Sequence, residues 1–253
     1  MNVILTAGGV PLPDEPLYPF TQGGYKALLD IAGKPMIQWV LDALSASKNI
    51  DRITVVGLPE KTHLASSKPM TMIESRGDMV TNILEGVASF NKQTQSSDAM
   101  LIVASDIPGL SSAMVDWFID IVEQSNNNVY YNVISKQVME NRFPGSRRTY
   151  VHLKDLEVCG GDMNALRADV ITADNANWQR LVEARKSPIK QASIIGFDTL
   201  LSLLLRRLTL KQAEVVASKR LGVRGQVIQC PYAEVGMDVD KPHQLEILRT
   251  SLS

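Results

Sequence analysis

The chain has 253 residues, of which 45% are hydrophobic and 21% are charged, and its formal net charge is -1 at pH 7. This composition is that of a globular protein with room for one large α/β domain. A nearly neutral chain has no broad basic field for binding nucleic acid or acidic membranes, so we expect neither as a partner. Two cysteines, Cys159 and Cys230, are too few for a disulfide framework and lack the spacing of a zinc site, which favours free thiols in a reducing cytoplasm.

Two apolar stretches are too short or too interrupted for membrane insertion. The first, Asn2 to Ala7, is shorter than the core of a secretory signal. The second, residues 192–208, contains Asp198 and includes Arg206 and Arg207 near its end, whereas a spanning helix needs roughly 20 apolar residues. We therefore expect a soluble cytoplasmic protein.

Short β-branched runs alternate along the chain with segments of helical period, a pattern typical of parallel strands covered by helices. The predicted strands lie near Val3–Thr6, Arg52–Val56, Met70–Ile73, Met100–Ala104, Asn128–Ile134 and Gln226–Gln229. The predicted fold class is α/β: a mostly parallel central sheet sandwiched by helices. We expect a single domain, residues 1–253, with a helical insertion at about residues 174–221 before the last strand.

Four helix starts stand out between these strands. Pro35 suits the first turn of a helix whose apolar stripe begins at Met36, and Ser111 or Ser112 can cap a helix after Pro108. Thr209 is placed to cap residues 210–221, and the last helix begins near Lys241 and Pro242, with Asp240 as its predicted N-cap residue. A hairpin is predicted in the region around residues 147–161.

The first site signal is the long loop after the first strand. Ligands bind beyond the carboxyl ends of parallel strands, where Gly8 and Gly9 would let the backbone approach closely and Lys26 would return a positive charge. A phosphate-rich ligand would satisfy both features. In the alternative interpretation, the glycines form a tight turn and Lys26 is a solvated surface residue. No dinucleotide-binding or Walker pattern is present.

Two aspartates are candidate ligands for Mg²⁺. Asp106 ends an apolar strand and precedes Pro108, and Asp238 lies just before the last helix. Mg²⁺ takes one or two carboxylates together with the oxygens of a substrate phosphate, so two carboxylates at strand-to-helix junctions could meet across one cation. The alternative is that Asp106 only stabilises a turn.

At these places the sequence resembles the MobA-like NTP transferases of the nucleotidyltransferase superfamily, whose Rossmann-like fold is shared with the GT-A group. Their glycine loop and lysine are matched here by "TAGGVPLP" and "GGYKALL". Their Asp-x-Pro motif is matched by Asp106 to Pro108, and their closing "DxDxPxxL" motif by Asp238 to Leu245. The resemblance covers most of the chain in order.

The resemblance implies an Mg²⁺-dependent enzyme that transfers a nucleoside monophosphate from an NTP to a small, anionic, phosphorylated acceptor and releases pyrophosphate. Residues 1–125 would form the nucleotide-binding half and residues 126–253 the acceptor-side half. Lys26, Asp106 and Asp238 would be catalytic, with the two aspartates on the metal. The implied nucleotide contacts are Ala7, Gly8, Gly9, Lys26, Asn82 and Gly86, and the implied acceptor contacts are Lys136, Gly161, Asn164 and Lys186.

The glycine loop departs from the family pattern in one respect. The arginine that follows the glycines in the family is missing, and Asp14 and Glu15 lie in that region instead. Two other functions therefore stay open at this point: a GT-A-like glycosyltransferase that uses a nucleotide sugar, and a non-catalytic nucleotide-binding module. The loop itself would fold over the nucleotide as a lid, and the apolar helical insertion could pack internally or form a homo-oligomer interface.

Overall fold

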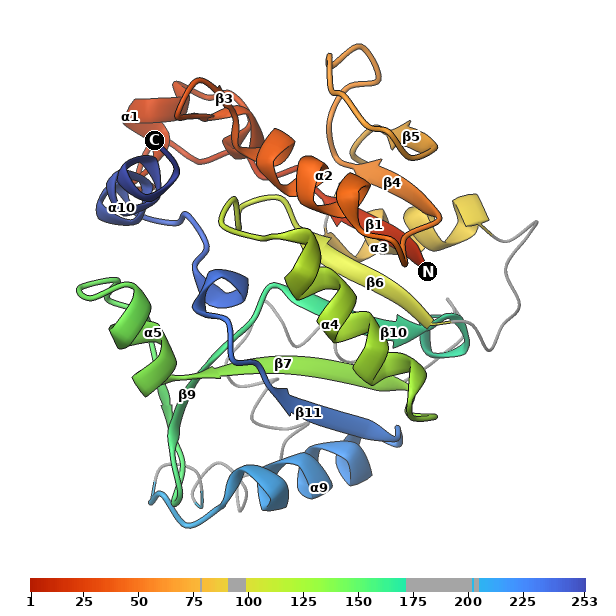
Figure 1. Cartoon of the computed structure of the whole chain (residues 1–253), viewed down its shortest axis with the longest axis vertical. Coiled ribbons are helices and arrows are strands. Elements are labelled where there is room, and N and C mark those ends of the chain that lie inside the picture. Colours follow the sequence, from red (N-terminus) through yellow and green to blue (C-terminus); the bar gives the residue numbers. More distant parts are fainter. Residues whose placement is uncertain (78, 91–98, 172–201, 203–204) are drawn as a thin grey trace.

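A computed structural model describes residues 1–77, 79–90, 99–171, 202 and 205–253 (Figure 1). Its main sheet has the strand order β5-β4-β1-β6-β10-β7-β9-β8, with β11 on the other edge of β7. The strands are β1 (Asn2–Thr6), β4 (Arg52–Val56), β5 (Met70–Ile73), β6 (Ala99–Ala104), β7 (Val129–Ser135), β8 (Val151–His152), β9 (Glu157–Gly160), β10 (Met163–Arg167) and β11 (Gly225–Gln229). All six predicted strands are confirmed.

The two halves of the sheet are built differently. Strands β5, β4, β1 and β6 run parallel to one another, while β10 lies antiparallel between β6 and β7. Strand β11 returns parallel to β7. The mixed, largely parallel sheet flanked by helices confirms the predicted α/β class.

Successive residues of β1 point to opposite faces of the sheet, and each face carries its own helices. Val3 and Leu5 belong to a core shared with α2 (Met36–Ala46), α4 (Ser112–Glu123) and α10 (Pro242–Leu252). Ile4 belongs to a second core with α3 (Met79–Phe90). This alternation follows from the period of two in a strand, and it fixes the carboxyl end of β1 between the two layers.

Strands β9 and β10 are two parts of one strand that is interrupted by a large bulge. Val133 pairs with Gly160, and Tyr130 pairs with Ala165, so residues 131–132 of β7 face residues 161–164. The side chain of Asn164 holds this bulge, because it accepts from the backbone N–H of Asn132 and donates to the carbonyl of Gly161, at 2.8 Å each. Bulges re-aim side chains, and the bulged residues lie at the carboxyl end of β6.

The remaining elements complete the fold. Helix α1 (Tyr18–Thr21) and the small β2–β3 hairpin (Asp30–Ile31 and Lys34–Pro35) lie in the first long connection, and α5 (Lys136–Arg142) follows β7. Helix α9 (Leu210–Leu221) begins after Thr209, whose side chain accepts from the N–H of Gln212, as predicted. Most of the predicted helical insertion, residues 174–201, lies outside the described residues. In the part of the chain that is described, no helix is both long and apolar enough to cross a membrane.

Candidate functional site

A cleft of ≈ 440 Å³ opens beyond the carboxyl ends of β1, β4 and β6. Its lining comes from both halves of the chain. The first half contributes Gly8, Gly9, Lys26, Asn82 and Asp106, and the second half contributes Asp162, Asp238 and Asp240. The position agrees with the general rule for open α/β sheets, and three of the residues predicted to be catalytic, Lys26, Asp106 and Asp238, lie together there.

Where the glycine loop leaves β1, the backbone of Gly8 lies very close to the backbone of Gly57. Gly57, at the end of β4, has φ +114, and a Cβ built on it would lie 2.3 Å from the nitrogen of Gly8. Only glycine fits such a contact. At the far end of the loop, the N–H of Lys26 donates to the carbonyl of Gly9 at 2.8 Å. The loop is therefore closed at its base, which returns Lys26 to the strand end where it started.

Lys26 is a half-buried cation between two carboxylates. Its Nζ lies 2.6 Å from Oδ2 of Asp106 and 2.5 Å from Oδ1 of Asp240. Burial alone lowers the pKa of Lys26, but the charges of Asp106 and Asp240 outweigh it, and the pKa is raised above its usual value. Lys26 is therefore not a solvated surface lysine, and it stays charged at neutral pH.

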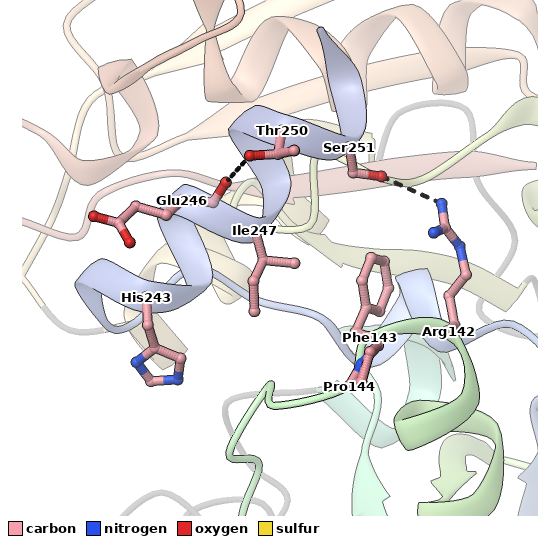
Figure 2. A pocket seen from close by; sticks show the side chains of 8 residues that line it. All are labelled: Arg142, Phe143, Pro144, His243, Glu246, Ile247, Thr250 and Ser251. Atoms are coloured by element: carbon pink, nitrogen blue, oxygen red, sulfur yellow. Dashed lines mark hydrogen bonds between the residues drawn. The ribbon is translucent and has the colours of Figure 1, made fainter.

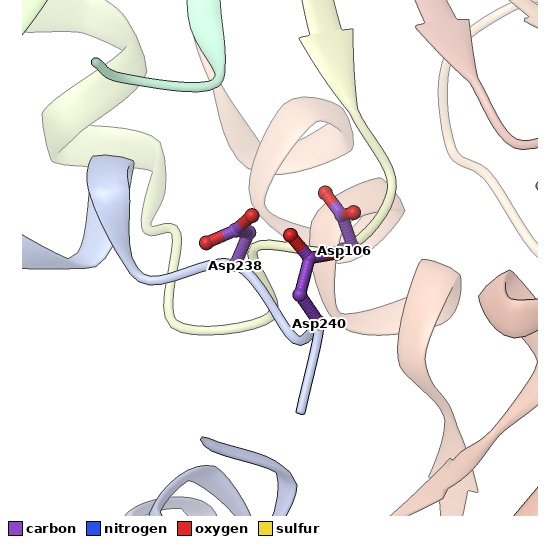
Figure 3. A group of neighbouring side chains, drawn as sticks. All are labelled: Asp106, Asp238 and Asp240. Atoms are coloured by element: carbon purple, nitrogen blue, oxygen red, sulfur yellow. The ribbon is translucent and has the colours of Figure 1, made fainter. Parts of the chain in front are cut away.

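Three carboxylates gather around one point (Figure 3). Each of Asp106, Asp238 and Asp240 offers an oxygen, and the three atoms lie within 4.8 Å of one another. The N–H of Val239 donates to the carbonyl of Asp106 at 3.0 Å and ties the two segments together. Oδ1 of Asp106 is buried and has no hydrogen-bond partner among the described residues. Hard oxygen donors with an unpartnered lone pair fit Mg²⁺.

The prediction that Asp240 caps the last helix is wrong. Helix α10 begins at Pro242, and its N-cap residue is Lys241. Gln244 instead accepts from the N–H groups of Asp240 and Lys241, at 3.0 and 2.9 Å. The side chain of Asp240 is free to face Lys26 for this reason, and it adds a third carboxylate to the two predicted from the sequence.

Two charged residues of the cleft region were not predicted as site residues. Asp162 lies in the β9–β10 bulge, where burial raises its pKa to about 7, assisted by the negative charges of Asp106 and Asp240 and opposed by Arg148 and Lys26. Arg148 forms an ion pair with Asp238. The neighbouring residues Gly161 and Asn164 were predicted to contact the acceptor, but the bulge that brings Asp162 to the cleft is a tertiary feature. No pattern in the sequence marked Arg148.

The predicted base contacts differ in their positions. Asn82 lines the cleft, where its side-chain carbonyl accepts from the N–H of Arg76 at 2.8 Å and its Nδ2 donates to Ser75. Gly86 is not among the lining residues. A Cβ on Gly86 would lie 3.0 Å from the side chain of Ile4, so this glycine lets α3 pack closely on β1.

The predicted acceptor contacts are mostly engaged elsewhere. Gly161 packs against the side chain of Asn132, and the side chain of Asn164 stabilises the bulge. Gly161 and Asn164 are both absent from the cleft lining. Lys136 pairs with Glu157 at 2.7 Å and is also outside the cleft lining. Lys186 lies outside the described residues. The structure places Asp162 of the same "GGDMN" segment in the cleft instead.

Of two further cavities, one borders the cleft and the other is separate from it. One, of ≈ 420 Å³, is walled by the long loop from Val10 to Leu17 and shares Gly9, Lys26 and Asp240 with the cleft. The other, of ≈ 550 Å³, lies between the end of α5 and α10 (Figure 2) and shares no lining residue with the cleft. There the cation of Arg142 is already paired with Glu234 at 2.7 Å and donates to Ser251.

Comparisons with known proteins agree with this architecture. The model of the MobA-like NTP transferase domain matches residues 21–171, more than half of the chain. A solved hypothetical transferase from Thermus thermophilus is 30% identical over 96% of this chain and 98% of its own, with a TM-score of 0.83. A CMP:2-keto-3-deoxy-manno-octonic acid synthetase complexed with CTP is 18% identical, covers 100% and 97%, and has a TM-score of 0.60.

A 4-diphosphocytidyl-2C-methyl-D-erythritol synthase, 13% identical over 100% of this chain and 98% of its own, has a TM-score of 0.56. At these identities, the two synthases show the shared fold alone. No curated protein sequence matches the chain.

Proposed function

Because the chain belongs to the MobA-like NTP transferase domain family, we propose that it transfers a nucleoside monophosphate from an NTP to a small phosphorylated acceptor and releases pyrophosphate. The observation that carries the proposal is the position of Lys26, whose Nζ lies between Asp106 and Asp240 in the same cleft as Gly8 and Gly9. A backbone that a phosphate can approach closely, a cation and clustered carboxylates are what transfer of a nucleotide group requires.

The metal is part of the proposal. Asp106, Asp238 and Asp240 would hold Mg²⁺, which when bound neutralises phosphate charge. Their oxygens are the donors that this ion prefers, and the unpartnered Oδ1 of Asp106 would gain a partner.

The residues of the chain divide the remaining work. An oxygen of the acceptor attacks the α-phosphorus, a new P–O bond forms, and the bond to the β-phosphate bridging oxygen breaks in line. Lys26 would bind the phosphate oxygens and hold the donor in place, and Gly8 and Gly9 would let the triphosphate lie against the backbone. Asp162, which lines the cleft from the second half of the chain, would face the acceptor.

The test is pyrophosphate release from each of the four NTPs with Mg²⁺, across a panel of sugar phosphates, polyol phosphates and sugar acids. The Asp106→Asn variant should lower kcat by about 100-fold or more, as loss of a preorganised charged group typically does. Asp42→Asn is the matched control, because Asp42 pairs with Lys34 on the surface, and it should leave turnover unchanged. Full turnover in Asp106→Asn would contradict the assignment.

The products also separate this function from the glycosyltransferase alternative. Nucleotidyl transfer releases pyrophosphate, whereas sugar transfer from a nucleotide sugar releases a nucleoside diphosphate. Release of a nucleoside diphosphate, with no pyrophosphate from any NTP, would overturn the proposal. Binding of an NTP without turnover across the whole panel would favour the non-catalytic module.

A further inference from the structure

The cleft is lined by more carboxylates than cations. Four carboxylates line it, those of Asp106, Asp162, Asp238 and Asp240. The ion pairs that these carboxylates form in the described part of the chain are with Lys26 and Arg148. Like charges at this spacing repel strongly in a partly buried site. Both cations therefore stabilise these carboxylates, and each cation lies on a carboxylate that would hold the metal.

Arg148 holds its carboxylate from behind the cleft. It lies in the segment that follows α5, and its side chain is only 15% exposed, against 12% for Asp238. It does not line the cleft, although Asp238 does. The guanidinium contacts Oδ1 of Asp238, so a divalent cation and Arg148 would compete for the same carboxylate.

Two buried polar atoms close to this pair have no partner. Nε of Arg148 and Oδ2 of Asp162 are both buried without a hydrogen bond among the described residues. The two side chains are close enough for the charge of Arg148 to lower the pKa of Asp162 against the effect of burial. Unpartnered buried donors and acceptors are costly, and a guanidinium on a carboxylate would satisfy both.

We propose that Arg148 is a positioning residue that pairs with Asp238 in the cation-free cleft and moves to Asp162 when a divalent cation takes Asp238. This inference rests on the metal site of the proposed function. In the cation-bound state the metal would pair with Asp238 and Arg148 with Asp162, which avoids the large cost of an unpaired buried charge. Arg148 thus sets how tightly the cleft binds its metal, and it keeps Asp238 in place before the metal arrives.

The experiment titrates the full-length protein with Mn²⁺ alone, followed by calorimetry and by the electron paramagnetic resonance signal of the free ion. Arg148→Gln should bind Mn²⁺ at least about tenfold more tightly, because a competing cation near the site is removed. Arg148→Lys keeps the charge and should stay within about threefold of the unmodified protein. The matched control is Arg147→Gln, since Arg147 is the exposed neighbour, and it should change nothing.

A double-mutant cycle tests the second position of the guanidinium. Asp162→Asn removes the receiving carboxylate, so it should weaken Mn²⁺ binding more when Arg148 is present than in the Arg148→Gln background. A difference of about threefold or more between the two backgrounds supports the exchange. Equal effects in both backgrounds would mean that Asp162 acts only through its charge, and the proposed movement would be overturned.

The direction of the main effect separates the proposal from a structural role. If Arg148 only supported the fold, Arg148→Gln would bind Mn²⁺ equally or more weakly, and that result overturns the inference. Thermal unfolding of each variant establishes that it is folded, and a misfolded Arg148→Gln is replaced by Arg148→Met in the same titration. If Mn²⁺ binds the unmodified protein but not Asp106→Asn, the metal site stands even when the Arg148 result fails. Absence of Mn²⁺ binding in every variant overturns both.

Discussion

At the scale of single residues, burial and neighbouring charges shift the pKa values of Lys26 and Asp162 in the cleft. Lys26 keeps a raised pKa only because Asp106 and Asp240 outweigh its desolvation. Asp162 is the opposite case, since burial and two neighbouring carboxylates raise its pKa to about 7. Perturbed groups of this kind cluster where chemistry is done, which supports the cleft as the candidate site.

The raised pKa of Asp162 makes a prediction about stability. The folded chain binds this proton more tightly than the unfolded chain, in which an aspartate has a pKa of about 3.9. The contribution of Asp162 to stability is therefore present at low pH and is lost as the pH rises from about 4 to about 7. In EDTA, the free energy of unfolding of Asp162→Asn should exceed that of the unmodified protein by about 1–3 kcal/mol between pH 5 and pH 8.

Urea unfolding at several pH values measures this difference. Asp14→Asn is the control, because Asp14 is exposed in the long loop. A stability difference for Asp162→Asn that does not change with pH would show that the folded carboxyl group ionises like an ordinary aspartate.

At the scale of elements, the contact between the ends of β1 and β4 sets the shape of the glycine-loop side of the cleft. Gly57→Ala would place a methyl group 2.3 Å from the nitrogen and 2.4 Å from the Cα of Gly8, at a backbone φ of +114. Overpacking and a positive φ together should lower the free energy of unfolding by about 3 kcal/mol or more. Gly8 would also be displaced from the cleft wall.

Gly33→Ala is the matched control for this change. Gly33 has φ +87, but a Cβ there meets nothing within 4 Å, so the control carries the backbone strain without the clash. It should cost about 1 kcal/mol. Urea unfolding and NTP binding are the measurements, and similar losses for both variants would contradict the importance of the Gly8–Gly57 contact.

The elements themselves were predictable because their signals are local. The six strands and the helices α2, α4, α9 and α10 follow from periodicity and capping residues that lie within each segment. Asp106 and Asp238 were predictable for the same reason, since Asp106 ends an apolar strand and Asp238 lies just before the last helix. The β9–β10 bulge, the Lys26–Asp240 contact and the Arg148–Asp238 pair join distant segments, and no local pattern encodes such a pairing.

At the scale of the whole molecule, the cleft is a junction between two halves. Lys26 and Asp240 are separated by 214 positions in the sequence and yet are in contact. A ligand that bridges Gly8 and Lys26 on one side and the carboxylates on the other should therefore stabilise the entire chain rather than one segment.

Thermal unfolding with each of the four NTPs tests this expectation. At a concentration of 100 Kd, the preferred NTP with Mg²⁺ should stabilise the protein by about 2.7 kcal/mol, which corresponds to roughly 5–10 °C in Tm for a chain of this size. The shift should depend on Mg²⁺ and should be lost in Asp106→Asn. A shift of the same size in EDTA would place the nucleotide away from the carboxylates.

The position of β10 between β6 and β7 also bears on how the chain reaches its native state. Strand β6, whose residues Met100, Leu101 and Val103 are fully buried, pairs with β1 on one edge, but its other edge is covered only when residues 163–167 arrive. A partly folded chain would therefore expose an apolar strand edge in the middle of the future sheet, where it can pair with another molecule. Refolding yield should fall as protein concentration rises, because aggregation then competes with the insertion of a single short strand.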